Sequence, residues 1–179
     1  MDPKRARFDW QVVPHLDAAY RFAFALARNR AEAEDLLQEA ALRAYRALDT
    51  LRGEQAKPWL LTIVRNCFLS ARAQAHRVAS VPLPQGAWCE GHASLIDPAP
   101  SPEQAVLDEG ERRAMGETLA ELGEEHREVL MLREVEELSY REIALVLGVP
   151  IGTVMSRLAR ARAALKATWL NRQAREVFP

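Results

Sequence analysis

The sequence predicts an all-α protein of two small helical domains joined by a flexible linker. Ala, Leu, Glu and Arg, which all favour helix, dominate the 179 residues. Apolar residues recur at helical spacing, and no run of alternating Val, Ile and Thr indicates a sheet. The helical pattern stops between residues 80 and 102, which contain five prolines. We therefore expect a first domain over residues 1–78, a linker over 79–102 and a second domain over 103–179.

The first domain is expected to contain at least three helices. Residues 14–48 have the apolar spacing of two successive helices. Polar residues 49–57 then predict a loop with Gly53 at its turn, and Pro58 suits the first turn of a third helix. The apolar face of this third helix comprises Trp59, Leu60, Ile63, Val64, Cys67 and Phe68. We therefore expect the tryptophan and the cysteine of this face to lie in the core; stacking on an unpaired nucleic-acid base is the alternative for the tryptophan.

The second domain begins with a Ser-Pro-Glu helix-start signal at residues 101–103. We expect an acidic helix over residues 103–122 and a break at Leu122 and Gly123. Three shorter helices should follow and end near Lys166.

The last two of these helices have the layout of a helix-turn-helix, which places its second helix in the DNA major groove. Ser139 and Glu142 have the spacing of a capping box at the start of the first helix. Gly148 can end that helix in a left-handed conformation, and the next two residues form the turn. Thr153 is then expected to cap the second helix.

The second helix of this motif has an apolar side and an outward side, at about 100° per residue. The apolar side comprises Val154, Leu158, Ala161 and Leu165. The outward side comprises Ser156, Ala159, Arg160 and Ala163, with Met155 at its edge. Small side chains around Arg160 let the backbone approach base edges, where arginine can bond guanine. Arg157 and Arg162 suit phosphate contacts or ion pairs within the domain; the alternative for the whole helix is a solvated amphipathic surface.

The net charge of −1 conceals an uneven distribution of charge along the chain. Residues 52–77 hold five basic residues and one acid, and residues 151–179 hold six and one. By contrast, residues 103–137 hold twelve acids and four arginines. Two basic patches in a near-neutral chain suggest two phosphate-binding surfaces, with acidic faces left for protein partners. Ordinary solvated helix surface is the alternative.

Both halves of the chain resemble bacterial sigma factors. Residues 33–48, AEDLLQEAALRAYRAL, and residues 58–73, PWLLTIVRNCFLSARA, are similar to sigma region 2. Residues 118–166, notably LREVEELSYREIA and GTVMSRLARARAAL, are similar to region 4. The two matches follow the family's order without a region 3 or a long region 1, which is the layout of the extracytoplasmic-function (ECF) group. The resemblance implies a region 2 helical bundle and a region 4 helix-turn-helix domain in a sigma factor that directs RNA polymerase to promoters and helps to open the DNA.

The resemblance also implies where RNA polymerase binds. Region 2 of the family docks on the clamp helices of the β′ subunit, and region 4 docks on the β flap. The positions that match the clamp-helix contact share one helical side, so they can meet a partner helix together. They are Asp35, Gln38, Glu39 and Leu42.

Region 2 of the family reads the minus-ten element of the promoter. The corresponding residues here are Leu51, Arg52, Arg65, Asn66 and Arg72. Asn66 matches a position that bonds a flipped base, and the two arginines of the helix are expected to follow the backbone. Leu51 stands where relatives often have an aromatic residue, which disfavours base stacking in this loop.

Region 4 of the family reads the minus-thirty-five element with the second helix of its helix-turn-helix. The corresponding residues here are Arg141, Thr153, Met155, Ser156, Arg157, Arg160 and Arg162. Met155 stands where relatives commonly carry arginine, so one base contact of the usual pattern is expected to be missing or apolar. Arg141 is expected to contact a phosphate.

The sequence predicts no catalytic site, no cofactor and no metal centre. Cys89 and His92 have the spacing of a weak metal signal, but two further ligands are not evident. The first ten residues lack the apolar stretch of a signal peptide, and no window reaches the roughly 18–20 apolar residues of a membrane span. We therefore expect a cytoplasmic protein with no membrane insertion of its own.

Two other functions are compatible with parts of the sequence. A sigma-like decoy would keep the fold to bind an anti-sigma factor without reading DNA, but it would have no reason to keep both basic patches. A one-component activator or repressor would not need the acidic helix of the first domain. For the sigma factor itself, the resemblance implies an anti-sigma factor as a further partner, and a flexible linker would permit a closed, inhibited arrangement.

Overall fold

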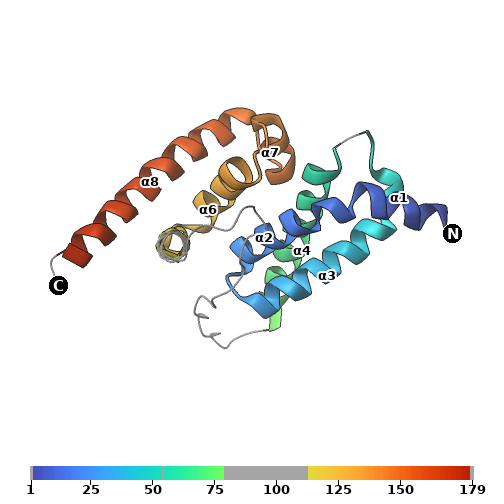
Figure 1. Cartoon of the computed structure of the whole chain (residues 1–179), viewed down its shortest axis with the longest axis horizontal. Coiled ribbons are helices and arrows are strands. Elements are labelled where there is room, and N and C mark those ends of the chain that lie inside the picture. The colour runs from blue at the N-terminus through green and yellow to red at the C-terminus, as the bar shows by residue number, and fades with distance from the viewer. Residues whose placement is uncertain (1, 54, 79–112, 178–179) are drawn as a thin grey trace, which may run out of the picture.

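Every regular element of the described residues is helical. The computed structural model describes residues 2–53, 55–78 and 113–177, and its helices form two groups along the chain (Figure 1). The helices up to residue 78 make up the first domain, and those from residue 113 onward make up the second. The all-α prediction is confirmed for these residues, whereas the predicted linker lies outside them.

Three mutually packed helices form the centre of the first domain. Its elements are α1 (Pro3–Gln11), the 3₁₀ turn η1 (Val13–His15), α2 (Leu16–Ala27), α3 (Arg30–Arg46), the 3₁₀ turn η2 (Leu48–Thr50) and α4 (Ala56–Val78). Helices α2, α3 and α4 contact one another around the fully buried Phe22, Leu60 and Leu61. Arg28 ends α2 in a left-handed conformation, and the side chain of Asn29 caps α3. The three predicted helices of this domain are therefore confirmed.

Helix α1 was not predicted from the sequence. Asp2 caps it, because its side chain accepts a hydrogen bond from the Lys4 amide at 3.0 Å, and Pro3 occupies the first helical position. The ring of Phe8 packs edge-on against Tyr45 of α3, with 5.4 Å between the ring centroids. None of the nine residues of α1 is fully buried, so the apolar periodicity that indicates the other helices is weak here. The Asp2-Pro3 pair, a cap followed by a proline in the first position, was the feature of the sequence that indicated the start of this helix.

The second domain contains a helix at 113–121, α6 (Glu124–Leu130), the π-helical turn η3 (Met131–Val135), α7 (Tyr140–Leu147) and α8 (Ile151–Val177). The break predicted at Leu122 and Gly123 is confirmed, and the part of the predicted acidic helix before residue 113 lies outside the described residues. Helix α8 has 27 residues and runs well beyond the predicted end at Lys166. Arg172 holds this extension against the helix at 113–121 by pairing with two of its acids.

The helix-turn-helix forms as predicted except at one cap. Ser139 and Glu142 make a complete capping box, and Gly148 ends α7 with a φ of 64°. However, α8 begins at Ile151, so Thr153 is its third residue and the prediction that it caps the helix is wrong. The physical reason is that the carbonyl of Pro150 accepts hydrogen bonds from the amides of residues 153 and 154, at 2.9 and 3.2 Å, and so starts the helix earlier.

The two domains pack against each other. Helix α2 contacts α6, and α4 contacts α7, so that α2 lies beside the second domain in the middle of the molecule (Figure 1). One cluster of buried apolar side chains extends from the first domain into the second. Among the described residues no single helix has the length and apolar composition of a membrane span; the α7–α8 pair, bent by 99°, meets that test only when its two helices are taken together. The packing of the domains therefore brings the two predicted functional halves into direct contact.

Candidate nucleic-acid and protein interfaces

The outer side of α3 presents the four residues predicted to contact a protein. All four side chains are exposed, and Leu42 is 55% exposed. The opposite side of the helix packs into the core through Ala33, Leu36, Ala40 and Ala44. Glu39 is held in place by Arg43, whose Nε donates to its carboxylate at 2.6 Å. This exposed side, which we call the α3 acidic face, comprises Asp35, Gln38, Glu39 and Leu42.

The loop between α3 and α4 does not expose Leu51. Its side chain is only 4% exposed and belongs to the core, so it is not available to stack on a base in this structure. Its backbone carbonyl accepts a hydrogen bond from Arg7 of α1 at 2.9 Å, which ties the loop to the first helix. The neighbouring Arg52 is exposed, and Gly53 turns the chain with a φ of 64°. Of the two predicted loop residues, only the arginine is accessible.

The apolar side of α4 faces the core. Trp59 is partly buried against the core, and its Nε1 donates to the hydroxyl of Thr50 at 3.3 Å. Cys67 is 3% exposed, and burial raises the pKa of its thiol. Both observations agree with the expected packing role of these residues. A stacking role for the tryptophan and a reactive thiol are therefore both disfavoured.

Asn66 lies at a hollow on the outer side of α4. A pocket of about 610 Å³ is lined by Asn66, Leu69, Ser70, Ala73 and Gln74 of this helix. Asn66 is exposed, and its amide carries both donors and an acceptor for the edge of a base. The Ser70 hydroxyl donates to the backbone carbonyl of Asn66. This contact does not involve the side-chain amide of Asn66. The prediction that Asn66 is accessible for a base is consistent with this geometry.

The two arginines of α4 that were predicted to follow the DNA backbone are paired with acids of the second domain. Arg65 Nε donates to the Glu128 carboxylate at 2.5 Å, and the Arg65 side chain is only 19% exposed. Arg72 pairs with Glu124, which lies at the start of α6. Sequence reasoning missed both partners because 63 and 52 residues separate the paired residues. The contrast between the basic stretch 52–77 and the acidic stretch 103–137 was the available signal.

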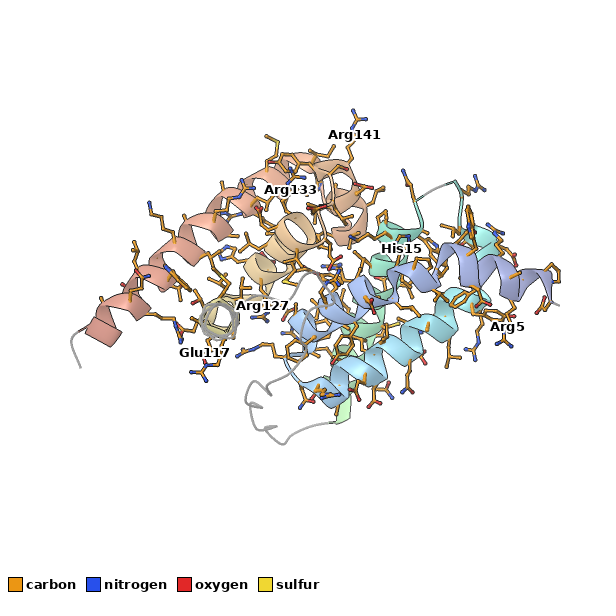
Figure 2. All side chains as sticks on the ribbon, viewed as in Figure 1. Arg5, His15, Glu117, Arg127, Arg133 and Arg141 are labelled. Carbon is orange, nitrogen blue, oxygen red and sulfur yellow. The ribbon has the colours of Figure 1, made fainter. Side chains whose placement is uncertain are left out.

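A buried carboxylate joins the domains at the other end of α4. Glu136 has no exposed side-chain surface, and Arg21 of α2 binds it with two hydrogen bonds, at 2.8 and 3.0 Å. Lys57 binds the same carboxylate at 2.9 Å and the Glu136 backbone carbonyl at 2.8 Å. His15 lies near the middle of the molecule (Figure 2), and burial, together with the charge of Lys57, lowers its pKa. This contact combines two cations of the first domain with one anion of the second.

Arg127 forms a further contact between the domains. Its guanidinium is buried between α6, the helix at 113–121 and α2 (Figure 2), and its Nε donates to the Ala25 carbonyl at 2.7 Å. The same group donates to the Leu122 carbonyl at 2.9 Å. Burial and the neighbouring charge of Arg28 lower its pKa. The Ala25 carbonyl near the C-terminal end of α2 thus receives a cation from the second domain, as helix ends favour.

The outward side of α8 is exposed as predicted. Met155 is 54% exposed, and Ser156 and Arg160 are exposed beside it, whereas Val154, Leu158 and Ala161 are buried. Arg160 Nε donates to the backbone carbonyl of Ser156 in its own helix, at 3.3 Å. Arg141 projects into solvent from the same end of the domain, near the top of the view in Figure 2. These residues form an accessible surface, which we call the α8 outer face, composed of Arg141, Met155, Ser156 and Arg160.

The other two arginines of α8 form ion pairs within the second domain. Arg157 lies 3.3 Å from Glu125, and Arg162 binds Glu134 at 2.7 Å. The sequence left phosphate contacts and ion pairs within the domain as alternatives for these two arginines. In this structure both arginines form ion pairs. Thr153 is partly buried, and its backbone carbonyl accepts a hydrogen bond from the Ser156 hydroxyl at 3.0 Å.

The described residues contain no group of three or more His, Cys, Asp and Glu side chains that could hold a metal ion. Cys89 and His92, the weak metal signal of the sequence, lie outside the described residues. The charged clusters that the structure does contain are ion pairs rather than ligand sets.

Comparison with known proteins finds the same two regions. The family model for sigma-70 region 2 matches residues 12–78, and that for sigma-70 region 4 matches residues 112–165. The RNA polymerase sigma-H factor of Pseudomonas aeruginosa is 37% identical over 166 residues, which cover 90% of this chain and 85% of that protein. The ECF RNA polymerase sigma-E factor of Escherichia coli is 37% identical over 135 residues, covering 73% of this chain and 70% of that protein.

Two solved structures are similar over most of the chain. The sigma factor RpoE of Bartonella quintana, in complex with the anti-sigma factor NepR, aligns with a TM-score of 0.68 and 30% identity, covering 90% of this chain and 95% of that chain. CnrH in complex with the cytosolic domain of CnrY aligns with a TM-score of 0.59 and 25% identity, covering 93% of this chain and 88% of that chain. The alignments extend over both domains rather than one.

The buried Glu128 makes the stability of the protein depend on pH. Burial raises the pKa of its carboxyl above the usual value, although the hydrogen bond from Arg65 acts in the opposite direction. When the pKa of a carboxyl is higher in the folded chain than in the unfolded chain, the folded chain favours the protonated form. The resulting stabilisation is complete at pH values below the pKa of the unfolded chain. It is lost as the pH rises through the pKa of the folded chain. We therefore expect the unfolding free energy of wild type, relative to Glu128→Gln, to increase as pH falls from neutral to about 5. Urea unfolding at several pH values measures this difference.

Glu34→Gln is the control for the loss of an exposed carboxylate, since Glu34 is 49% exposed on α3. A wild-type advantage over Glu128→Gln that shrinks on acidification would contradict this account of Glu128.

Proposed function

The chain belongs to the ECF group of the sigma-70 family, and from that premise we propose that it binds core RNA polymerase through α3 and promoter DNA through α4 and α8. The observation that carries the proposal is that the α3 acidic face and the α8 outer face are both exposed, while each helix packs into the core through a different, apolar side. A protein surface and a nucleic-acid surface therefore coexist on one chain. Such a protein works in the cytoplasm, where RNA polymerase transcribes DNA.

The α3 acidic face supports docking on a polymerase helix. Three polar side chains lie beside the exposed Leu42 on its N-terminal side, so an apolar contact adjoins groups that can fix orientation. Asp35 and Glu39 are one helical turn apart and can meet basic side chains of a partner helix together. We propose that this partner is the clamp-helix segment of the β′ subunit, and that the second domain docks on the β flap.

The α8 outer face supports reading of duplex DNA at the minus-thirty-five element. Ser156 and the nearby alanines are small, so the helix backbone can approach the bases while Arg160 reaches a guanine. Met155 offers an apolar contact, which suits the methyl group of thymine. Arg141 on α7 is placed to bind a phosphate and fix the register of the helix.

The outer side of α4 supports reading of the separated minus-ten strand. Asn66 and its pocket offer hydrogen bonds and space for an unstacked base, and Arg52 is exposed in the adjoining loop. Promoter opening then draws on the binding energy of the flipped base. We favour this function over the decoy alternative because the residues proposed to read DNA at both elements, Asn66 and Arg160, are accessible.

An anti-sigma factor is the further partner that we propose. RpoE is bound to the anti-sigma factor NepR and CnrH to the cytosolic domain of CnrY, and both structures align with most of this chain. A partner protein bound to the α3 acidic face would compete with polymerase for it.

Replacing Asp35 by Asn should weaken binding to core RNA polymerase while leaving the fold intact. The loss of one exposed charge at a helix contact is expected to cost about 1–2 kcal/mol. Fluorescence anisotropy of the labelled chain titrated with core enzyme measures the affinity. Asp9→Asn on α1 makes the same chemical change outside the α3 acidic face, and equal losses for the two variants would count against docking at α3.

Replacing Asn66 by Ala should leave polymerase binding unchanged and reduce promoter opening. A lost set of hydrogen bonds to one base should lower the open-complex population by about five- to 30-fold, that is about 1–2 kcal/mol. Permanganate reactivity of unpaired thymines measures opening directly. Asn171→Ala on α8 serves as the matched control, and normal opening by Asn66→Ala would exclude the proposed base contact.

Replacing Arg160 by Ala should abolish discrimination at one position of the minus-thirty-five element, at a cost of about 1–3 kcal/mol. Run-off transcription from promoters with each base at that position measures the discrimination. Arg172→Ala removes an arginine from the same helix that pairs with acids rather than facing outward. The proposal for Arg160 fails if the two variants respond to the promoter series in the same way.

A further inference from the structure

We propose that Trp10 of α1 is a stacking platform for an unpaired base of the melted promoter strand, next to the minus-ten residues of the α3–α4 loop. The inference rests on the function proposed above for α4 and this loop, and it adds an aromatic contact from a different helix. Helix α1 precedes residues 12–78, which the region 2 family model matches. The contact therefore comes from a part of the chain outside that match.

Trp10 presents most of its side chain to solvent. It is 78% exposed, which is the highest value among the large apolar side chains of the described residues. It is also the only aromatic side chain in the exposed class within this part of the sequence. Tryptophan is highly buried on average, so an exposed indole ring with both of its faces near water is uncommon. Such a ring offers a flat apolar surface to a partner.

Trp10 lies on the side of α1 that borders the loop between α3 and α4. At about 100° per residue, Trp10 is only about 60° around the helix axis from Arg7, one turn earlier. The Arg7 guanidinium donates to the Leu51 carbonyl at 2.9 Å and so holds this side of α1 against the loop. The turn η1, which follows α1, contacts α4. Trp10 is therefore placed between two contacts that join its segment to the loop and to the helix after it.

Two exposed cations accompany the ring. Arg7 adjoins Trp10 on α1, and Arg52 is exposed in the loop to which α1 is bound. A positive track beside an aromatic ring is the usual combination in sites for single-stranded nucleic acid, because the cations follow the phosphates while the ring stacks on a base. The charge beside Trp10 therefore suits a nucleic-acid strand.

The neighbouring acids of the described residues are paired elsewhere. Asp9 lies 4.0 Å from Arg5, and both are on the side of α1 that faces away from Arg7. In Figure 2 Arg5 lies below α1, whereas the α3–α4 loop lies above it. Asp49, which precedes the loop, is bound to Lys4 at 3.3 Å. The charge that remains on the loop side of α1 is therefore positive.

The minus-ten residues proposed above supply no exposed aromatic ring of their own. Leu51 is buried, and Trp59 packs against the core. Asn66 and Arg52 can bond a base edge and a phosphate, but a base that has left the duplex also loses its stacking neighbours. Stacking on an aromatic side chain replaces this contact, and it tolerates any sequence because every base has a π face. Trp10 supplies the component that the other residues lack.

A protein partner is the other occupant to consider for an exposed tryptophan. The centre of a protein interface is a continuous apolar surface. Beside Trp10, the exposed large apolar side chain nearest in sequence is Val13, at 42% exposure, and the position one turn earlier is Arg7. A single ring beside cations fits a base better than it fits an apolar protein patch.

Variants of Trp10 in the holoenzyme of core RNA polymerase and the full chain test this inference. On a promoter found by mapping of transcription start sites, Trp10→Ala should lower the open-complex population by about five- to 100-fold, read by permanganate reactivity. Trp10→Phe keeps an aromatic ring and should restore most of the opening. Trp10→Leu keeps apolar bulk without a ring and should behave like Trp10→Ala. All three variants should bind core enzyme like wild type.

Two variants serve as controls. Leu170→Ala removes a side chain that is 52% exposed on α8, and Arg5→Ala removes a cation from the other side of α1. Both should open the promoter like wild type, within about twofold. Circular dichroism confirms that each variant is folded, and Trp10→Leu keeps the test available if Trp10→Ala unfolds.

The base analogue 2-aminopurine detects the stacking itself. Its fluorescence is strong when the base is unstacked and weak when it stacks on an aromatic ring. With the analogue at successive positions of the melted strand, one position should be dim in wild-type open complexes and bright in those of Trp10→Ala, per open complex formed. A purely structural role of Trp10 would not single out one position.

Three results would overturn the inference. They are normal opening by both Trp10→Ala and Trp10→Leu, weaker binding of core enzyme by these variants, which would make the partner a protein, and no position at which the fluorescence depends on Trp10. Failure of the proposed function would appear instead as wild-type holoenzyme that opens no promoter, and it would refute both proposals. A holoenzyme that opens promoters but gives any of the three results refutes the role of Trp10 alone.

Discussion

The ion pairs between α4 and the second domain determine how the rest of this molecule is arranged. A buried carboxylate such as Glu136 is costly unless cations meet it, and Arg21 and Lys57 do so from two different elements of the first domain. Their combined geometry fixes the end of α4 against η3, and Arg127 fixes the end of α2 against α6. Directional contacts of this kind specify one docking orientation, whereas the apolar cluster that continues between the domains supplies non-directional burial.

The same pairs connect the fold to the proposed function. Cations that bind phosphate must be accessible, yet an unpaired row of cations beside an apolar interface would repel itself and remain poorly solvated. In this structure Lys57, Arg65 and Arg72 are each paired with an acid of the second domain.

Local signals in the sequence predicted the local structure well. The capping box at Ser139, the left-handed Gly148 and the apolar side of α8 were all predicted correctly, because each depends on neighbours within a few residues. The start of α8 was placed too late, since the carbonyl of Pro150 begins the helix before the threonine that resembles a cap. Helix α1 was missed because packing of its few apolar side chains on α3, rather than a strong periodic pattern, stabilises it.

The interfaces were predicted less completely, for a different reason. Exposure of the α3 and α8 residues follows from helical periodicity, so their faces were identified correctly. The partners of Arg65 and Arg21 lie 63 and 115 residues away, and no periodicity links them. The burial of Leu51 likewise depends on how the loop packs between α1 and the core. The opposite charges of residues 52–77 and 103–137 indicated that these segments attract each other. They did not indicate which basic residue pairs with which acid.

The most direct test of a promoter-selecting subunit is to map where transcription begins. Core RNA polymerase, with and without this chain, would transcribe a library of genomic fragments, and sequencing would identify the 5′ ends of the RNAs. The account predicts a small set of start sites that appears only with the chain and shares two separated upstream sequence elements. Start sites distributed as with core enzyme alone would contradict it.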